Sequence, residues 1–352
     1  MKRKLLVAVP LLCLVAVLAW LFRPKHESLG AAYISERTVT LFSSIAQVRE
    51  QVGVLYYGER VDVLAHRNDY AKVRTASGEE GWIDARYLMD PGLWQRSEKL
   101  IEQTKAMAVQ ARGRTKTTTN LRIAPGRTEP RLYQFARGTE MEIFGRSVAD
   151  WVQVTDEKEA TEGEPSKKED WYLVRGIATR PPGEGAIRNS AVMTTTQPGD
   201  QTIPIAGWVV GRFISLDLPD PVQAGTSAAN VRPIAWFVLN TVTDGTGTHP
   251  QYLVAGTRSG EGQACDFSTL RVFTWNPKKS RYETAYIEND LCGVLPVQVG
   301  KASKGEPEFR FHEMGGAKQE RVYHLVQTVI RREHQEGAAV SARSRKASKA
   351  NH

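Results

Sequence analysis

Gly58-Glu59-Arg60-Val61-Asp62-Val63-Leu64 decides the architecture of this chain, because a degenerate copy, Gly138-Thr139-Glu140-Met141-Glu142-Ile143-Phe144, begins 80 residues later. In the first copy, Val61 and Val63 alternate with polar residues, as in a strand with one buried face. Three further pairs match at the same offset: Leu41 with Leu121, Val52 with Leu132, and Leu55 with Phe135. Such a repeat indicates one supersecondary unit used twice. The unit is a small, turn-rich β module, which is more typical of an adaptor than of a catalyst.

Each copy closes with a Gly-Trp pair, Gly81-Trp82 in the first and Gly207-Trp208 in the second. The offset there is 126 instead of 80, so 46 residues have been inserted into the second copy. Long loops on a rigid barrel are where recognition tends to be located.

The position of the insertion has two solutions. Residues 150–154 match residues 69–73 at an offset of 81, and residues 170–175 match the same strand at an offset of 101. The first alignment needs a single insertion and is preferred, with residues 171–176 as an added strand inside it.

The ordered motifs resemble the bacterial SH3-like (SH3b, SH3 type 3) domain. Its members carry an early Asn-Leu-Arg, an apolar-Gly-x-x-apolar strand, an aromatic-x-x-Val strand and a closing Gly-Trp-apolar. The first copy has them at Thr40-Leu41-Phe42, 58–63, 70–74 and Gly81-Trp82-Ile83; the second keeps Asn120-Leu121-Arg122 and Gly207-Trp208-Val209. The resemblance implies small barrels that bind peptidoglycan or protein partners.

Aromatic side chains are the binding candidates of these barrels. They are Tyr70, Trp82, Trp151, Trp171 and Trp208. For Trp82 and Trp208 a core position at the barrel end is expected to outweigh a ligand contact, with the indole N–H reaching a carbonyl.

The N-terminus has the pattern of a targeting signal. Lys2-Arg3-Lys4 precedes residues 5–22, eighteen residues without a charge, which is just enough to cross a membrane as a helix. No small-x-small cleavage site ends the run, so a signal anchor is expected, with a cleaved secretion signal as the alternative. The anchor would make this a single-pass protein of the inner (cytoplasmic) membrane with its bulk in the periplasm or extracellular space. Much of the net charge of +8 lies at the two chain ends, so nucleic acid is not an expected partner.

Cys265 and Cys292 form an even pair outside the apolar run, and in an exported chain they predict a disulfide. A cysteine hydrolase would need a thiolate beside a base such as His312 or His324, but the residues around both cysteines lack the motifs of such enzymes. Metal-ligand spacings are also missing. We therefore expect no catalytic residue, no metal and no cofactor.

The expected fold is mainly β: two small SH3-like β-barrels in tandem joined by a helix, a C-terminal all-β or α+β domain, and an N-terminal transmembrane helix. The expected boundaries are 1–30 for anchor and spacer, 31–90 for barrel one, 91–114 for a helical linker, 115–218 for barrel two with its insertion, 219–233 for a Pro-rich linker, 234–333 for the β-rich domain, and 334–352 for a disordered basic tail. The final run at 321–330 is either a strand or a helix.

The favoured function is that of a membrane-anchored, non-catalytic binding or scaffold protein of the cell envelope, whose modules recognise peptidoglycan or envelope proteins. One alternative is a structural or assembly component of an envelope complex. A second alternative is a cell-wall hydrolase with SH3-like targeting modules. The sequence leaves the oligomeric state open.

Overall fold

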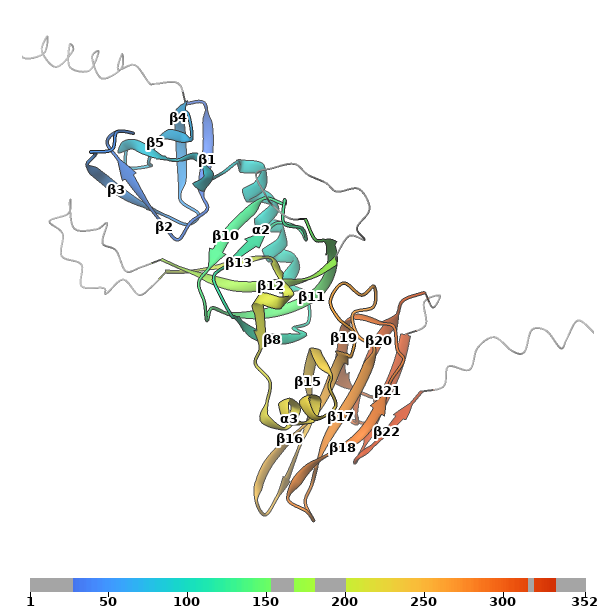
Figure 1. Ribbon diagram of the computed structural model, residues 1–352. Helices are drawn as coiled ribbons and strands as arrows, with labels where there is room; N and C mark the ends of the chain where they lie inside the picture. Colours follow the sequence, from blue (N-terminus) through green and yellow to red (C-terminus); the bar gives the residue numbers. More distant parts are fainter. Residues whose placement is uncertain (1–27, 153–167, 181–200, 316–319, 334–352) are drawn as a thin grey trace, which may run out of the picture. The chain divides into compact units, whose positions relative to one another are not determined.

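The computed structural model describes residues 28–152, 168–180, 201–315 and 320–333 (Figure 1). This part of the chain is mainly β, with four antiparallel sheets and two short α-helices. The first barrel, up to Trp94, forms one compact unit; residues 95–179 and those from 201 onward form the other.

The first barrel is a seven-stranded sheet with the order β3-β2-β6-β5-β4-β1-β7. Its strands are β1 (Gly30–Ile34), β2 (Thr38–Phe42), β3 (Gln51–Tyr56), β4 (Arg60–Arg67), β5 (Tyr70–Arg74), β6 (Glu80–Asp84) and β7 (Leu88–Met89), with the 3-10 turn η1 (Ala85–Tyr87) before β7. In β4, Val61 and Val63 are buried between partly exposed or exposed neighbours, as the alternation predicts. They join Ile34, Leu41 and Val73 in one apolar core.

The second barrel repeats this order strand for strand, as β10-β9-β13-β12-β11-β8-β14. Its strands are β8 (Ala111–Thr115), β9 (Thr119–Arg122), β10 (Arg131–Phe135), β11 (Glu140–Asp150), β12 (Lys168–Arg180), β13 (Gln201–Val210) and β14 (Ile214–Leu216), with the turn η3 (Gly211–Phe213) before β14. An irregularity in pairing recurs as well. The register shifts between Val63 and Ala65 in β4, and between Ile143 and Gly145 in β11, 80 residues on.

The preferred alignment of the insertion is wrong. Val73 of β5 pairs with Val63, and Val174 of β12 pairs with Ile143, so β12 is the counterpart of β5 at an offset of 101. Asp150 instead ends β11, opposite Lys168. The extra residues therefore fall into two hairpins: the offset rises from 80 to 101 between β11 and β12, and from 101 to 126 between β12 and β13.

The closing glycines have the same function in both barrels. A Cβ at Gly81 would lie 2.6 Å from the Leu41 side chain and 2.7 Å from the Phe42 carbonyl oxygen. At Gly207 it would lie 2.7 Å from both the Leu121 side chain and the Arg122 carbonyl oxygen. The Gly-Trp motif thus marks the point where β6 and β13 cross closely over β2 and β9.

Helix α2 (Pro91–Lys105) starts where Asp90 accepts a hydrogen bond from the Leu93 amide at 2.9 Å. The helix ends at Lys105, earlier than the expected linker boundary at 114, because Ala111 already belongs to β8. Gly113 lies in β8, where a Cβ would come within 2.5 Å of the Ser215 carbonyl oxygen.

The C-terminal domain contains two four-stranded antiparallel sheets, each in sequential order. They are β15 (Arg232–Asp244), β16 (Gly247–Thr257), β17 (Thr269–Asn276) and β18 (Arg281–Glu288), followed by β19 (Gly293–Lys301), β20 (Pro307–Glu313), β21 (Glu320–Val326) and β22 (Val329–Arg332). The final run is thus strand and not helix. The expected Pro-rich linker contains a helix, α3 (Asp220–Ala228), whose Val222 packs with Tyr252, Val254 and Phe273 on the first of these sheets.

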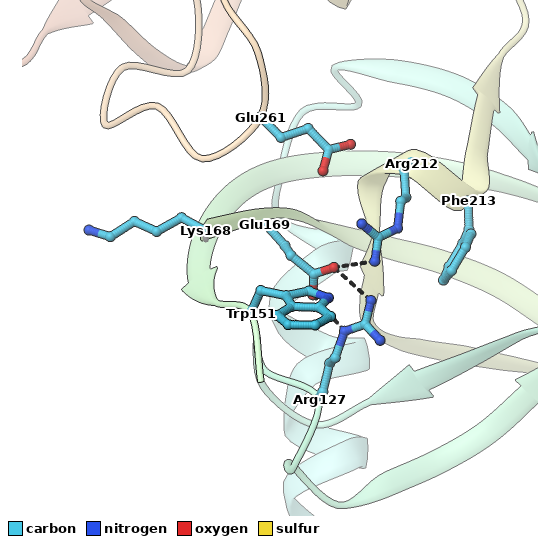
Figure 2. Close-up of a pocket in the computed structure, with 7 residues that line it drawn as sticks. All are labelled: Arg127, Trp151, Lys168, Glu169, Arg212, Phe213 and Glu261. Carbon is cyan, nitrogen blue, oxygen red and sulfur yellow. Dashed lines mark hydrogen bonds and ion pairs between the residues drawn. The ribbon is translucent and has the colours of Figure 1, made fainter. Parts of the chain in front are cut away.

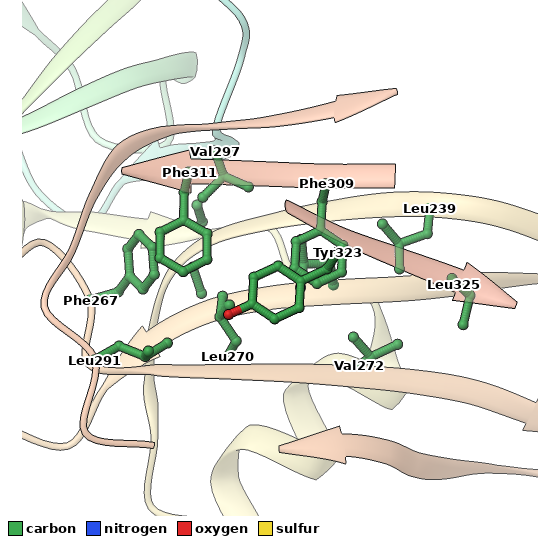
Figure 3. Close-up of a cluster of buried hydrophobic side chains, with 13 residues drawn as sticks. Leu239, Phe267, Leu270, Val272, Leu291, Val297, Phe309, Phe311, Tyr323 and Leu325 are labelled. Atoms are coloured by element: carbon green, nitrogen blue, oxygen red, sulfur yellow. The ribbon is translucent and has the colours of Figure 1, made fainter. Parts of the chain in front are cut away.

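Side chains from both C-terminal sheets meet in one core, part of which Figure 3 shows. Its buried members are Ala235, Leu239, Leu253, Ala255, Phe267, Leu270, Val272, Leu291, Val297, Phe309, Phe311, Tyr323 and Leu325. Tyr323 is stacked on Phe309 and donates a hydrogen bond from its hydroxyl to Glu288 at 2.8 Å.

Alkaline pH is expected to destabilise this domain. Burial raises the pKa of Tyr323 from 10.0 to about 12. The folded state therefore retains the phenol proton more tightly than the unfolded chain, so the stabilisation is complete below pH 10 and is lost as the pH rises to about 12. We expect the free energy of unfolding to fall by about 2 kcal/mol over this interval. Denaturant titrations between pH 8 and 12 would measure it; Tyr323→Phe should show a smaller fall, and an equal fall would refute this origin.

The predicted membrane-spanning helix and single-pass inner-membrane localisation need correction. Within the described ranges, no helix is both long and apolar enough to cross a membrane. The apolar run at 5–22 and the basic tail at 334–352 lie outside the described residues. The fold that the described residues show is a mainly β arrangement of four antiparallel sheets.

Candidate functional site

A cavity of about 740 Å³ opens on the second barrel (Figure 2). Its lining residues are Arg127, Trp151, Lys168, Glu169, Arg212, Phe213 and Glu261. The β9–β10 loop supplies Arg127, and η3 supplies Arg212 and Phe213. The β11–β12 hairpin supplies Trp151, Lys168 and Glu169. The last residue, Glu261, comes from the C-terminal domain. Three parts of the barrel surface therefore meet at one cavity, and a fourth segment comes from another domain.

Glu169 organises the cationic side of this pocket. Its carboxylate is 2% exposed and accepts two hydrogen bonds from Arg127, at 2.8 Å from Nε and 2.7 Å from Nη2. The guanidinium of Arg212 contacts the same carboxylate. The hydrogen bonds to Glu169 raise the pKa of Arg127, so this cation stays charged. Two arginines share one carboxylate, which leaves one net positive charge on the cluster.

Aromatic rings flank both arginines. The guanidinium carbon of Arg127 is 5.7 Å from the ring centroid of Trp151, and that of Arg212 is 5.4 Å from the centroid of Phe213. Both distances are within the range of a cation–π contact. The pocket thus combines fixed guanidinium groups, which suit carboxylates, with ring faces, which suit apolar or planar groups.

The first barrel carries a related arginine–aromatic pair at the corresponding turn. Arg86 is 4.9 Å from the ring centroid of Tyr87 in η1, at the same offset of 126 that relates the closing Gly-Trp pairs. A second cluster lies by β2 and β5, where Arg49 is 3.8 Å above the Phe42 ring and 5.8 Å from Tyr70.

The structure separates the five aromatic candidates. Trp151 lines the pocket, and Tyr70 lies beside Arg49. Trp171 is 1% exposed and is a core residue, so its side chain offers almost no surface to a ligand. Trp82 and Trp208 are partly exposed next to buried Ile83 and Val209. Neither is among the fully buried core residues.

Sequence reasoning missed most of the pocket: Arg127, Lys168, Glu169, Arg212, Phe213 and Glu261. The Arg212-Phe213 pair was detectable, because it matches Arg86-Tyr87 at the offset of the closing motif. Nothing local in the sequence marks Glu169 as the shared partner of two arginines, since its contacts come from residues 42 and 43 positions away.

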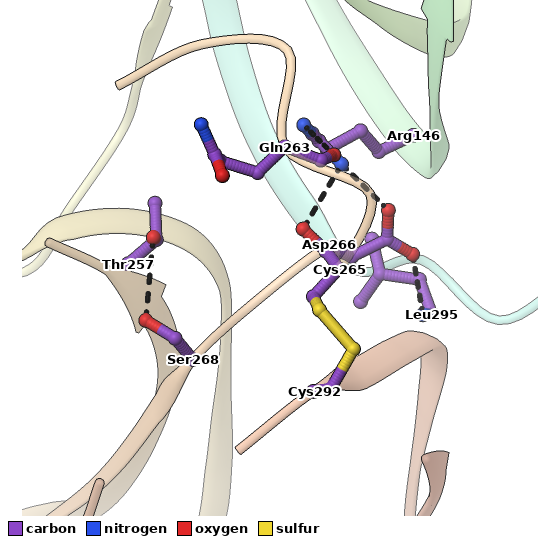
Figure 4. Close-up of a disulfide and its surroundings, with 8 residues drawn as sticks. All are labelled: Arg146, Thr257, Gln263, Cys265, Asp266, Ser268, Cys292 and Leu295. Atoms are coloured by element: carbon purple, nitrogen blue, oxygen red, sulfur yellow. Dashed lines mark hydrogen bonds and ion pairs between the residues drawn. A yellow bond between two sulfur atoms is a disulfide. The ribbon is translucent and has the colours of Figure 1, made fainter. Parts of the chain in front are cut away.

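The predicted disulfide between Cys265 and Cys292 is present, with an S–S distance of 2.01 Å (Figure 4). Next to it, Arg146 donates hydrogen bonds to the carbonyl oxygens of Gln263 at 2.9 Å and Cys265 at 3.3 Å. The loop that carries Glu261 is therefore bonded to the second barrel. In the described ranges, no group of three or more His, Cys, Asp or Glu side chains is arranged to hold a metal ion.

Comparison with known proteins gives one family match and several distant structural matches. Among curated proteins none matches the sequence. Solved structures that match include NlpC2 and NlpC1 from Trichomonas vaginalis, each 9% identical with a TM-score of 0.16, covering 86% of this chain and 91% and 87% of theirs. An NlpC/P60 family protein from Bacillus cereus ATCC 10987 is 10% identical with a TM-score of 0.21, covering 88% of this chain and 96% of that one. TM-scores this low carry no argument about fold or activity.

The family match falls on the first barrel, within the segment whose motifs resemble the SH3-like pattern. It covers β3 to β7, together with the preceding loop that contains Arg49. The same span contains Tyr70, the Gly81-Trp82 pair and the turn η1. This chain therefore contains a bacterial SH3 domain, matched at residues 47–89.

Proposed function

We propose that this protein is a non-catalytic cell-wall-binding protein and that the pocket of its second barrel takes the ligand. The bacterial SH3 domain at residues 47–89 supports cell-wall binding. The second barrel has the same strand order, and we propose that it is a second copy of that module. The observation on which the proposal chiefly depends is the pair of arginines, each beside an aromatic ring, around Glu169.

The chemistry of this pocket fits a peptide that carries carboxylates. Arginine presents a planar fork of donors that matches a carboxylate with two parallel hydrogen bonds. Arg127 and Arg212 retain one unbalanced positive charge beside Glu169, and Lys168 adds another at the rim. Trp151 and Phe213 offer apolar surface for the backbone or side chains of the same ligand. The peptide parts of a cell wall meet both requirements.

A binding role without catalysis also agrees with the state of the cysteines. Cys265 and Cys292 are joined to each other, whereas a cysteine hydrolase needs a free thiolate. The alternative is that the barrels serve as docks for other proteins in an assembly. Arginine–aromatic clusters suit protein partners as well.

Sedimentation with purified peptidoglycan sacculi tests the proposal. The full-length chain should be retained in the pellet, and free peptide stems released from the sacculi should displace it. A chain that stays in the supernatant at all concentrations would refute wall binding and favour the protein-docking alternative.

Trp151→Ala is expected to weaken retention on sacculi about 10-fold, equivalent to about 1.4 kcal/mol. The ring is partly exposed and lines the pocket, so its loss removes ligand contact without opening the barrel core. The binding isotherm from sedimentation measures the change. Val152→Ala is the matched control, because Val152 lies in the same hairpin, is 46% exposed and does not line the pocket. Equal losses in both variants, or none in either, would exclude this pocket as the contact.

A further inference from the structure

We infer that Glu261, which the C-terminal domain contributes to the pocket, binds a free amino group of the ligand, so that the pocket selects peptides bearing both carboxylates and an amine. This inference rests on the proposed function of the same pocket. It adds a specificity-determining residue from outside the barrel and narrows the ligand to a class.

The charges of the pocket are divided between two sides. Arg127, Arg212 and Glu169 form a connected cluster with an excess of positive charge. Figure 2 shows Glu261 across the pocket from Arg127, with no hydrogen bond or ion pair drawn between Glu261 and the other residues. Among the described residues, neither Glu261 nor Lys168 forms a salt bridge. The pocket thus presents a cationic cluster around Glu169 and, among the described residues, a second carboxylate, Glu261, that no salt bridge neutralises.

The position of Glu261 is fixed by the residue that follows it. The amide of Gly262 donates a hydrogen bond to Asp170 Oδ1 at 2.8 Å. Gly262 has a φ of +79°, and a Cβ there would lie 2.6 Å from the Lys168 Cβ and 2.7 Å from the Lys168 carbonyl oxygen. Only glycine fits so close to β12 in this conformation. The loop is therefore packed directly on the strand that carries Glu169.

Arg146 holds the other side of the loop. Its guanidinium donates to the Gln263 carbonyl oxygen at 2.9 Å and pairs with Asp266 at 3.0 Å. Asp266 also accepts a hydrogen bond from the Leu295 amide at 2.8 Å. Glu261 consequently precedes a segment that is bonded at three successive points. Because these bonds hold the backbone next to Glu261, this part of the loop needs little ordering when a ligand binds.

A neighbouring cavity gives such a ligand room to extend. This second cavity, of about 430 Å³, is also lined by Arg212 and Glu261. Lys116 adds positive charge to its lining, and Arg232, which pairs with Asp170 at 3.0 Å, also lines it. Glu261 therefore lies where the two cavities meet, with cations on either side. An acidic peptide that contains a diamino acid has the complementary order of charges, with carboxylates toward the arginines and lysines and its ammonium group toward Glu261.

The test uses two probes that differ in one charge. Peptide stems released from sacculi carry carboxylates and a free amine, and acetylation removes only the charge of the amine. Calorimetric titration of the full-length wild-type chain should show about 10-fold tighter binding of the free-amine probe, the size expected for one charge-assisted hydrogen bond. Glu261→Gln should weaken binding of that probe about 10-fold and leave binding of the acetylated probe within about 2-fold.

Each other outcome has a defined meaning. Glu98→Gln, at an exposed position of α2 outside both cavities, should leave both affinities unchanged. If Glu261→Gln strengthens both probes alike, Glu261 merely reduces the positive potential of the pocket and the inference is wrong. It is equally wrong if the wild type binds both probes with the same affinity, although peptide binding itself would then stand. If neither probe binds the wild type, peptide binding by this pocket fails as well. Thermal unfolding of each variant verifies that it is folded.

Discussion

Arg146→Met should lower the free energy of unfolding of the second unit by about 3–5 kcal/mol, the usual loss when one partner of a buried ion pair is removed. The Arg146 side chain is 1% exposed and pairs with Asp170 at 2.5 Å and with Asp266 at 3.0 Å. Removing the guanidinium leaves two buried carboxylates without their shared cation.

The pKa values of the two aspartates show how much they depend on this cation. Burial opposes ionisation of Asp170, but the hydrogen bonds from Arg146 and the Gly262 amide prevail, so its pKa lies below the ordinary value. At Asp266 burial prevails over the Leu295 amide and Arg146, so its pKa is raised. Without Arg146, burial still disfavours the charged form of both carboxylates, and protonating one of them reduces this free-energy penalty most easily. The destabilisation should therefore be smaller at pH 4 than at pH 7.

Urea unfolding followed by tryptophan fluorescence measures this effect, with buried Trp171 as a reporter inside the second barrel. The control is Arg310→Met, since Arg310 is 43% exposed and its pair with Glu308 is only partly buried, so its loss should destabilise the protein less than loss of the buried Arg146. If both variants lose similar amounts, the buried network does not contribute to stability by joining the barrel to the C-terminal domain.

The repeat was readable from the sequence because strands preserve spacing. Residues 58–64 and 138–144 keep the same offset through β4 and β11, including the register shift after Val63 and Ile143. A strand with one buried face cannot gain or lose a residue without turning its apolar side chains outward. The family match to residues 47–89 falls on the copy with the shorter hairpins.

The alignment failed where spacing is not constrained. Asp150-Trp151 and Asp170-Trp171 are the same dipeptide, and either could begin a strand. One tryptophan is 1% exposed and belongs to the core, while the other lines a pocket. Hairpin ends accept insertions at little cost. The alignment that needs the fewest insertions places a single one, whereas the chain has two. Only pairing with β11 distinguishes the two tryptophans.

The pocket was hard to predict because its partners are distant in sequence. Arg146 and Asp266 are 120 residues apart, and the Gln110 side chain bonds the backbone of Val297 across 187 residues. These contacts place Glu261 beside the second barrel, and no periodic pattern in the sequence predicts them. Loops that contribute single residues to a site leave no local pattern.

Loss of the disulfide should also have a large effect, because Cys265 belongs to the loop that Arg146 holds. The bond closes a loop with a sequence separation of 27, which corresponds to about 3–4 kcal/mol on the chain-entropy estimate. The Cys265→Ser, Cys292→Ser double variant should therefore unfold at lower urea concentration, and reduced wild type should behave like it. Because Glu261 lies four residues before Cys265, the variant should also lose part of its preference for the free-amine probe.

These two readouts distinguish a local role of the disulfide from a global one. At urea concentrations well below the unfolding transition, the Arg146 and Asp170 contacts still hold residues 262–266 in the reduced protein. The preference should then fall by about 2- to 3-fold instead of vanishing, because a charge-assisted contact weakens as the loop gains freedom. A double variant within about 1 kcal/mol of wild type would refute the chain-entropy estimate for this loop. A complete loss of preference with unchanged stability would instead place the control of Glu261 in the disulfide alone, since the network would then be unable to hold the loop by itself.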